Sequence, residues 1–129
     1  MKKVLVVDDS EVNLYLFQAI FKMDPEIQVD IESNSTKAIS RLREGYPDVL
    51  VLDLMMPHID GFELLHQIKA DPGINKIPIL IVSARQDSEA YNRVMDFDVQ
   101  GYIKKPIQMT EVESKIREII FSQEPEAEK

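Results

Sequence analysis

The sequence has no cysteine and only four glycines among its 129 residues. Without cysteine the chain can form neither disulfide bonds nor thiolate metal sites, and a reducing compartment fits this composition. The glycines form neither a G-x-G-x-x-G motif nor a P-loop, which are the phosphate-binding loops of many nucleotide-binding proteins. This absence disfavours a nucleotide or flavin carrier.

Long apolar runs and an excess of positive charge are also missing. No run approaches the ~18 apolar residues of a membrane span, and the N-terminal MKKVLVVDDS is too short and too acidic for a signal peptide. The formal net charge is −8, with 23 acidic against 15 basic residues, whereas nucleic-acid-binding domains usually have a basic surface. We expect a soluble, cytoplasmic protein that binds neither membranes nor nucleic acid directly.

Five short apolar segments predict strands, at residues 4–7, 27–31, 48–53, 77–84 and 101–105. The third and fourth are continuous apolar runs, which is typical of parallel strands buried on both faces. The second alternates apolar and polar residues, so we expect it to be exposed on one side or to lie near an edge. The fifth is the weakest of the five.

The segments between the strands have helical periodicity, and each begins near a capping residue. The predicted caps, in chain order, are Ser10, Asn34 or Ser35, Asp60 with Glu63, Ser88, and Thr110 with Glu113, and the two that have a glutamate partner are predicted capping boxes. Gly45 is placed to end the second helix, and Phe97 belongs to the apolar face of the fourth.

Strand and helix therefore alternate five times, which predicts an α/β fold with a parallel sheet covered on both faces. Right-handed crossovers give a flavodoxin-like doubly wound (βα)5 sheet with strand order 2-1-3-4-5. One domain spans residues 1–121, and residues 122–129 form a polar tail or the start of a linker.

Three carboxylates follow two strands that are neighbours in this predicted sheet. Asp8 and Asp9 end the first strand and Asp53 ends the third, so their side chains meet at the edge where doubly wound sheets bind ligands. A divalent cation would offset the repulsion, and oxygen ligands favour magnesium. The adjacent pair could equally cap the following helix, but an acid within the run DVLVLDL rarely serves stability.

Two further strand ends carry polar groups toward the same edge. Ser83 closes the fourth strand with a hydroxyl, and Lys105 closes the fifth with an ammonium that could balance the carboxylates. Each has a simpler explanation, since Ser83 could begin a turn and Lys105 could be a solvated surface lysine. The combination of four strand ends with complementary chemistry favours a functional site.

The motifs VLVVDDSE, PDVLVLDLMMPHIDGFEL, PILIVSA and GYIKKPI occur in this order. Together they resemble the receiver domain of bacterial two-component response regulators, of the chemotaxis-regulator-like kind. The resemblance runs from about residue 3 to residue 121. A single DD or KP pair would be weak support, but the ordered set is specific.

The resemblance implies a role for each polar residue of the site. Asp53 would be the phosphoacceptor, attacking a phosphohistidine to form an acyl phosphate. Asp8, Asp9, Asp53 and the backbone carbonyl of Met55 would hold Mg²⁺ or Mn²⁺. The metal and Lys105 would neutralise charge on the phosphoryl group during transfer.

Ser83 and Tyr102 occupy the family's switch positions, where the hydroxyl turns toward the phosphoryl group and the aromatic ring moves inward. Tyr102 could equally be a half-buried strand aromatic with its hydroxyl in water. The Lys105–Pro106 bond is often cis in the family. The surface of the fourth helix, fifth strand and fifth helix would carry the signal.

The implied partners are a sensor histidine kinase or a histidine phosphotransfer protein, and an output domain or downstream protein. A homodimer that forms on phosphorylation is also compatible with the family. The protein would be a phosphoacceptor switch that assists its own phosphorylation and dephosphorylation, not a turnover enzyme. Two alternatives stay open, a magnesium phosphatase with an aspartyl nucleophile and an interaction domain with a vestigial site.

Several other residues lie near these motifs. Pro57 and Gly61 fit the family's loop after the acceptor, where we expect them to stop the third strand and free the chain to turn. His58 and His66 are not spaced as a compact ligand pair, so we expect surface histidines. Met55 occupies a position that tunes acyl-phosphate lifetime in the family, as does Arg85.

Overall fold

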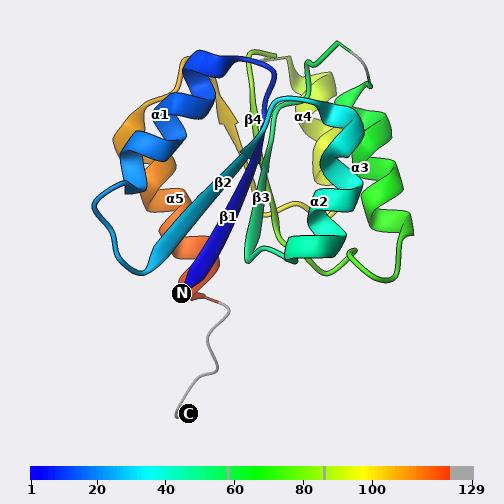
Figure 1. The fold of residues 1–129 in the computed structure, drawn as a ribbon. Coiled ribbons are helices and arrows are strands. Elements are labelled where there is room, and N and C mark those ends of the chain that lie inside the picture. The colour runs from blue at the N-terminus through cyan, green and yellow to red at the C-terminus, as the bar shows by residue number, and fades with distance from the viewer. Residues whose placement is uncertain (58, 86, 123–129) are drawn as a thin grey trace, which may run out of the picture.

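A computed structural model describes residues 1–57, 59–85 and 87–122 of the chain. The strands and helices follow one another in regular alternation (Figure 1). They are β1 (Lys2–Val7), α1 (Glu11–Phe21), β2 (Ile27–Glu32), the 3-10 turn η1 (Ser35–Lys37), α2 (Ala38–Gly45), β3 (Val49–Leu52), α3 (Gly61–Ala70), β4 (Ile79–Ser83), α4 (Ser88–Met95), β5 (Gly101–Lys104) and α5 (Met109–Phe121).

The strands form one parallel sheet in the order β2-β1-β3-β4-β5, as predicted. β2 lies at one edge and is mostly half-buried, which confirms the prediction from its alternating sequence. The short β5 lies at the other edge. In Figure 1, α1 and α5 cover one face of the sheet, and α2, α3 and α4 cover the other.

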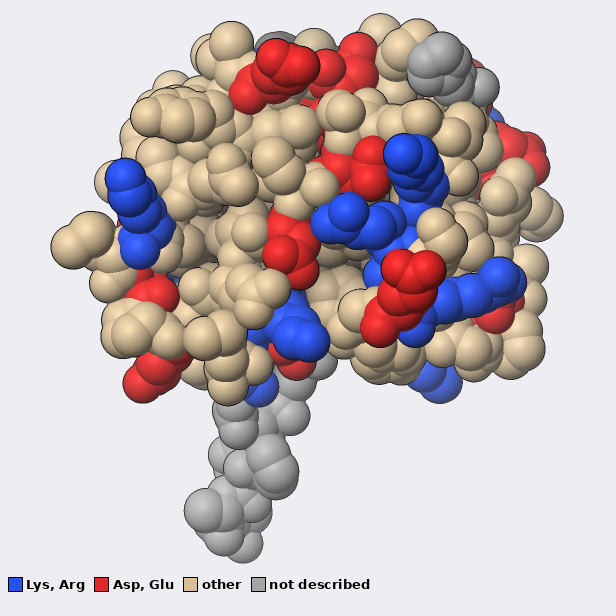
Figure 2. All heavy atoms as spheres, viewed as in Figure 1, with Lys and Arg blue, Asp and Glu red and all other residues tan. Residues whose placement is uncertain are grey.

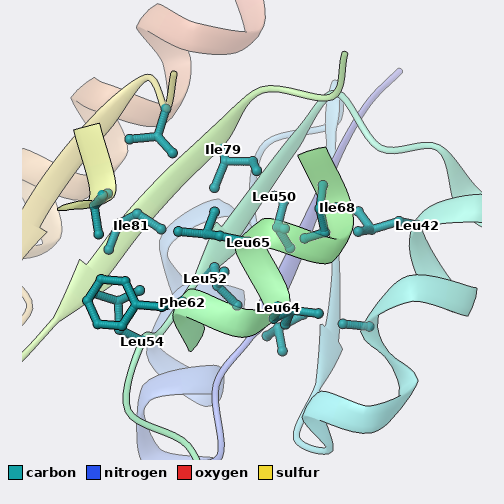
Figure 3. Close-up of a cluster of buried hydrophobic side chains, with 14 of the residues drawn as sticks. Leu42, Leu50, Leu52, Leu54, Phe62, Leu64, Leu65, Ile68, Ile79 and Ile81 are labelled. Carbon is teal, nitrogen blue, oxygen red and sulfur yellow. The ribbon is translucent and has the colours of Figure 1, made fainter. Parts of the chain in front are cut away.

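Alternate residues of the central strands supply two separate hydrophobic cores. In β3, for example, Val49 and Val51 belong to the core under α1 and α5, whereas Leu50 and Leu52 belong to the core under α2, α3 and α4. Figure 3 shows the second core, in which Leu65 of α3 lies against the leucines of β3. This two-sided burial explains why the central strands read as continuous apolar runs.

Two of the predicted helix starts are confirmed, and a third predicted cap, Asn34, caps η1 and not α2, whose N-cap is Lys37. The Ser10 hydroxyl caps α1 by accepting from the Asn13 N–H at 3.3 Å. The Asp60 carboxylate caps α3 by accepting from the Phe62 N–H at 2.8 Å. Asn34 caps η1, the turn that leads into α2. Each of these side chains satisfies an N–H that has no partner within its own helix.

The start of α4 differs from the prediction by one residue. Asp87, and not Ser88, is the cap, and its carboxylate accepts from the Ala90 N–H at 3.1 Å. The helix ends at Met95, so Phe97 lies beyond it but still packs against the core. Both residues of the Asp-Ser pair are good caps, and sequence alone did not separate them.

The two predicted capping boxes are wrong. Thr110 lies inside α5, because the backbone leaves the extended conformation directly after Gln108, which provides no side-chain cap. Glu113 therefore falls in the second turn and pairs with an arginine one turn further on. Glu63 accepts a hydrogen bond from Gln67 on the surface of α3, not from the N-cap backbone.

Gly45 is the last residue of α2, as predicted, and the residue directly after it, Tyr46, is the left-handed C-cap with φ of 41°. Pro57 and Gly61 differ from the prediction. β3 ends at Leu52, well before Pro57, so Pro57 does not stop the strand. Gly61 is required by space, because a Cβ there would lie 2.4 Å from the Leu54 Cα.

The tail from residue 123 onward lies outside the described residues, so the predicted boundary at residue 121 can be followed only as far as Ser122, which caps the end of α5. Of the helices in the described ranges, none is long and apolar enough to cross a membrane.

Candidate functional site

Asp8, Asp9 and Asp53 come together at the carboxyl ends of β1 and β3. The two strands are paired up to Val7 and Leu52, and the Asp53 N–H continues the pairing by donating to the Val7 carbonyl at 3.1 Å. Carboxylate oxygens of the three aspartates lie within 4.8 Å of one another. In Figure 2, acidic side chains gather at the upper edge of the molecule, above the strand ends of Figure 1.

Lys105 faces this acidic cluster from the end of β5. Its backbone N–H donates to the Ser83 carbonyl at 2.9 Å, which places it beside β4. Its ammonium lies 3.1 Å from Asp8 Oδ2 and 3.1 Å from Asp53 Oδ2. Lys105 is therefore not a solvated surface lysine but the cation that joins two buried carboxylates. The Lys105–Pro106 peptide bond is cis, as the resemblance implies.

Burial and charge set the titration of the site. Burial raises the pKa of Asp53, which is only 4 % exposed, and the nearby Asp8 carboxylate raises it further. The Met55 N–H and Lys105 act in the opposite direction without cancelling these effects. Burial alone would lower the pKa of Lys105, but attraction to Asp53 and Asp8 gives a net rise. The ammonium therefore stays charged at neutral pH.

The donor set of the cluster fits a hard divalent cation. Three carboxylates meet there, and among the described side chains only one cation, Lys105, contacts them. The cluster is thus under-neutralised, and all of its side-chain donors are oxygens, which magnesium prefers. In the part of the chain that the structure describes, no other group of three metal-ligating side chains occurs.

Because the pKa of Asp53 is raised in the folded state, its ionisation should destabilise the protein. The contribution of Asp53 to the free energy of unfolding is fully present below the ordinary pKa of 3.8. It is lost as pH rises through the folded-state pKa. In chelator at neutral pH, we therefore expect Asp53→Asn to unfold with a free energy about 1 kcal/mol higher than wild type. Urea titrations from pH 4 upward should show the advantage growing with pH, and an advantage that is constant or reversed would contradict it.

Ser83 and Tyr102 lie next to each other beside the cluster. Ser83 is fully buried at the end of β4, and its hydroxyl accepts from the Arg85 N–H at 3.2 Å, so it does begin a turn. The half-buried Tyr102 donates its hydroxyl to the Arg85 carbonyl at 2.8 Å and packs against Tyr91 of α4. Burial raises the pKa of the Tyr102 hydroxyl, which also lies near Ser83. The tyrosine is thus tied to the loop between β4 and α4.

The remaining candidates are Met55, Arg85 and the two histidines. The Met55 side chain is 55 % exposed, while its N–H donates to Asp53 Oδ1 at 3.1 Å. Arg85 makes two side-chain hydrogen bonds to the Asp87 carboxylate, which raise its pKa. His66 is exposed on α3, where its ring meets Phe97 edge-on. His58 lies outside the described residues.

Asn13 is a contact of the site that the sequence analysis missed. Its side-chain amide donates to Asp8 Oδ2 at 3.3 Å from the first turn of α1. The available signal was a polar residue three positions after the Ser10 cap, at the place where a capping box has its second member.

Comparison with known proteins points to one family. The family model described as "Response regulator receiver domain" matches residues 4–117. The response regulator ArlR of Staphylococcus saprophyticus is 32% identical over 125 residues, covering 95% of this chain and 54% of that protein. The transcriptional regulatory protein KdpE of Staphylococcus aureus is 30% identical over 117 residues, covering 91% and 49%. This chain spans about half the length of these curated relatives.

Solved structures agree with the fold. The phosphorylated cyanobacterial phytochrome response regulator RcpA superimposes with a TM-score of 0.82 at 27% identity, covering 96% of each chain. The receiver domain of a DNA-binding response regulator from Colwellia psychrerythraea gives a TM-score of 0.85 at 24% identity, covering 94% of this chain and 99% of that one. None of these similarities favours a phosphatase. The chain belongs to the receiver-domain family of two-component response regulators, whose members are phosphorylated on aspartate.

Proposed function

We propose that Asp53 accepts a phosphoryl group from a phosphohistidine and that the domain acts as a magnesium-dependent signalling switch. One observation carries the proposal. A half-buried lysine ammonium lies 3.1 Å from two buried carboxylates that, with a third, form an under-neutralised cluster at the strand ends. A site built for stability alone would pair its charges more evenly.

The contacts of Asp53 support different tasks for its two oxygens. Oδ1 is held by the Met55 N–H, so we infer that Oδ2, which faces Lys105, would be the nucleophile. The new bond forms between Oδ2 and phosphorus while the P–N bond to the donor imidazole breaks and leaves its electron pair on nitrogen. Lys105 can then turn from the carboxylates to a phosphoryl oxygen, where its charge opposes the negative charge of the transferring group.

The residues that would hold the ion are Asp8, Asp9, Asp53 and the backbone carbonyl of Met55. When bound, Mg²⁺ or Mn²⁺ supplies positive charge to the phosphoryl oxygens and relieves the repulsion between the carboxylates. Asp8 and Asp53 are buried, whereas Asp9 is exposed. We therefore expect a phosphodonor to approach from the side of Asp9.

Output would follow from the contacts around Ser83. A phosphoryl oxygen would accept from the Ser83 O–H, and turning the hydroxyl toward it would weaken the bond that this hydroxyl accepts from the Arg85 N–H, in the loop that Tyr102 also contacts. Only such a difference in interaction between two states can shift their equilibrium. The altered surface would be α4, β5 and α5, where a 520 Å³ groove is lined by Tyr91, Tyr102 and Lys115 among others.

We propose that the domain acts in the cytoplasm and that its upstream partner is a sensor histidine kinase or a histidine phosphotransfer protein. An output domain or a separate protein would lie downstream, and phosphorylation could promote a homodimer. The acidic net charge of −8 supports action on nucleic acid only through such a partner. A vestigial site is not supported, because each of the expected polar groups is in place.

Intact-mass measurement tests the proposal. Incubation with a small phosphodonor and Mg²⁺ should add one phosphoryl group to wild type, and omission of the ion should suppress the addition. Asp53→Asn should add none, while Asp48→Asn, which changes a carboxylate at the other end of β3, should behave as wild type. Equal labelling of wild type and Asp53→Asn would contradict the proposal.

The acyl phosphate should be comparatively long-lived. Met55 offers no carboxylate or amide to orient an attacking water, and the guanidinium of Arg85 is engaged by Asp87. We expect Met55→Asn to shorten the lifetime, by less than the ~100-fold at the low end of general-base effects, because an amide can orient an attacking water but cannot accept its proton. Decay of the labelled protein in magnesium buffer measures this, and a wild-type decay as fast as the variant's would count against it.

A further inference from the structure

The side chain of Asn13 provides a contact to the acidic cluster that the proposed function does not use. Within the described ranges, Asn13 and Lys105 are the only side chains that donate to the three carboxylates, and both donate to Asp8 Oδ2. Lys105 brings a charge, whereas the Asn13 amide is neutral. The amide must present its nitrogen to Asp8, since an ionised carboxylate only accepts.

The start of α1 explains why Asn13 is free to reach Asp8. In a capping box, the residue three positions after the cap accepts from the N–H of the cap residue. Here the Ser10 N–H donates to Asp8 Oδ1 at 2.9 Å, so that position needs no partner from Asn13. The Asn13 side chain turns instead to the other oxygen of Asp8, while its own N–H donates to the Ser10 hydroxyl.

As a result, both oxygens of Asp8 are tied to the first turn of α1. Oδ1 is held by a backbone N–H and Oδ2 by the amide, so the plane of the carboxylate is fixed relative to the helix. The buried Asp8 is 2 % exposed and has little water to replace a lost donor. Hydrogen bonds of this kind orient carboxylates for metal ions.

Asn13 becomes more important when Lys105 moves. In the proposed function, Lys105 leaves Asp8 for the phosphoryl group, and Oδ2 then keeps one side-chain donor among the described residues. We propose that Asn13 is a positioning residue that holds Asp8 in the orientation that receives the divalent cation. This inference rests on the proposed function for its purpose, but its effect on metal binding can be measured without phosphorylation.

Calorimetric titration of the full chain with Mg²⁺ tests the inference. Asn13→Leu removes the donor at similar size and should weaken Mg²⁺ binding by about tenfold, the low end for loss of such an outer contact. Asn13→Gln keeps an amide and should bind more tightly than Asn13→Leu. Gln18→Leu makes the same chemical change at an exposed position of α1 and should bind as wild type does.

Two further measurements separate positioning from a general effect on the fold. In chelator, Asn13→Leu should stay folded and unfold in one cooperative urea transition, with a midpoint below that of wild type because the buried Asp8 carboxylate loses a donor. The Mg²⁺ concentration for half-maximal phosphorylation should rise about tenfold, while the rate at saturating Mg²⁺ should change little.

Wild-type Mg²⁺ affinity in Asn13→Leu would overturn the inference, as would equal losses in Asn13→Leu and Gln18→Leu or in Asn13→Leu and Asn13→Gln. A wild-type protein that binds Mg²⁺ but takes up no phosphoryl group would instead refute the proposed function. The titrations would still decide the role of Asn13.

Discussion

Replacing Gly61 by alanine should destabilise the domain by about 3 kcal/mol, because overpacking against backbone cannot be relieved by a rotamer change. The added Cβ would lie 2.4 Å from the Leu54 Cα and 2.6 Å from the Leu54 carbonyl oxygen. That same carbonyl accepts from the Gly61 N–H at 3.0 Å. The methyl group would therefore push α3 away from the loop that follows Asp53.

Gly45→Ala is the matched control, because nothing lies within 4 Å of a Cβ at that position and its φ is not positive. Removing a helical glycine should stabilise the protein by up to ~1 kcal/mol. Urea unfolding of both variants measures the difference. A Gly61→Ala protein as stable as Gly45→Ala would show that the start of α3 does not press against the backbone of Leu54.

Lys105→Met should impair both stability and phosphorylation. Removing one partner of a buried ion pair leaves uncompensated charge, and with the lysine partly accessible we expect a loss of about 2–3 kcal/mol in chelator at neutral pH. Phosphorylation by a small donor should slow by about a hundredfold, the usual effect of losing one group that stabilises developing charge. Asp8 and Asp53 would then face each other without an ammonium.

Lys104→Met is the control for this change, since its side chain is exposed at the neighbouring position, the end of β5. It should leave the labelling rate and the unfolding midpoint close to those of wild type. Saturating Mg²⁺ should recover part of the stability of Lys105→Met, because a ligand that binds only the folded state stabilises it. Combining Lys105→Met with Asp53→Asn should also reduce the loss, since one of the uncompensated carboxylates is gone. If Lys105→Met alone were labelled and unfolded as wild type is, that result would contradict the role of Lys105.

The general positions of strands and site residues could be predicted because they depend on patterns of apolar and acidic residues that are visible in the sequence. Central strands such as β3 are apolar on both faces, and an aspartate at the end of such a strand stands out. Parallel strands also place their ends together, so the proximity of Asp8 and Asp53 follows from the predicted strand order alone.

The exact residue at which a helix begins, and the contacts of a single residue, could not be predicted in this way. Asp87 and Ser88 are equally good caps, and in the structure Asp87 takes this position. Thr110 had the right neighbours for a capping box, but the N-cap of α5 is Gln108, two residues earlier. Gly61 was expected to allow a turn, whereas its real constraint is the backbone of Leu54, which only the folded chain brings against it.

The Asn13 contact was missed for a related reason. A polar residue in the first turn of a helix is ordinarily solvated or part of a cap. The position of Asn13 in the sequence therefore does not indicate that its side chain contacts Asp8. Its partner is set by the Ser10 N–H bond to Asp8, which becomes visible only in three dimensions.

Mapping the phosphorylated residue is the most direct test of the central claim. After labelling with a small phosphodonor in Mg²⁺, borohydride reduction converts an acyl phosphate to a stable alcohol that tandem mass spectrometry can locate. The proposed site predicts reduction at Asp53 alone, with Asp8 and Asp9 unchanged. Label at either of those two, or at a carboxylate outside the cluster, would contradict it.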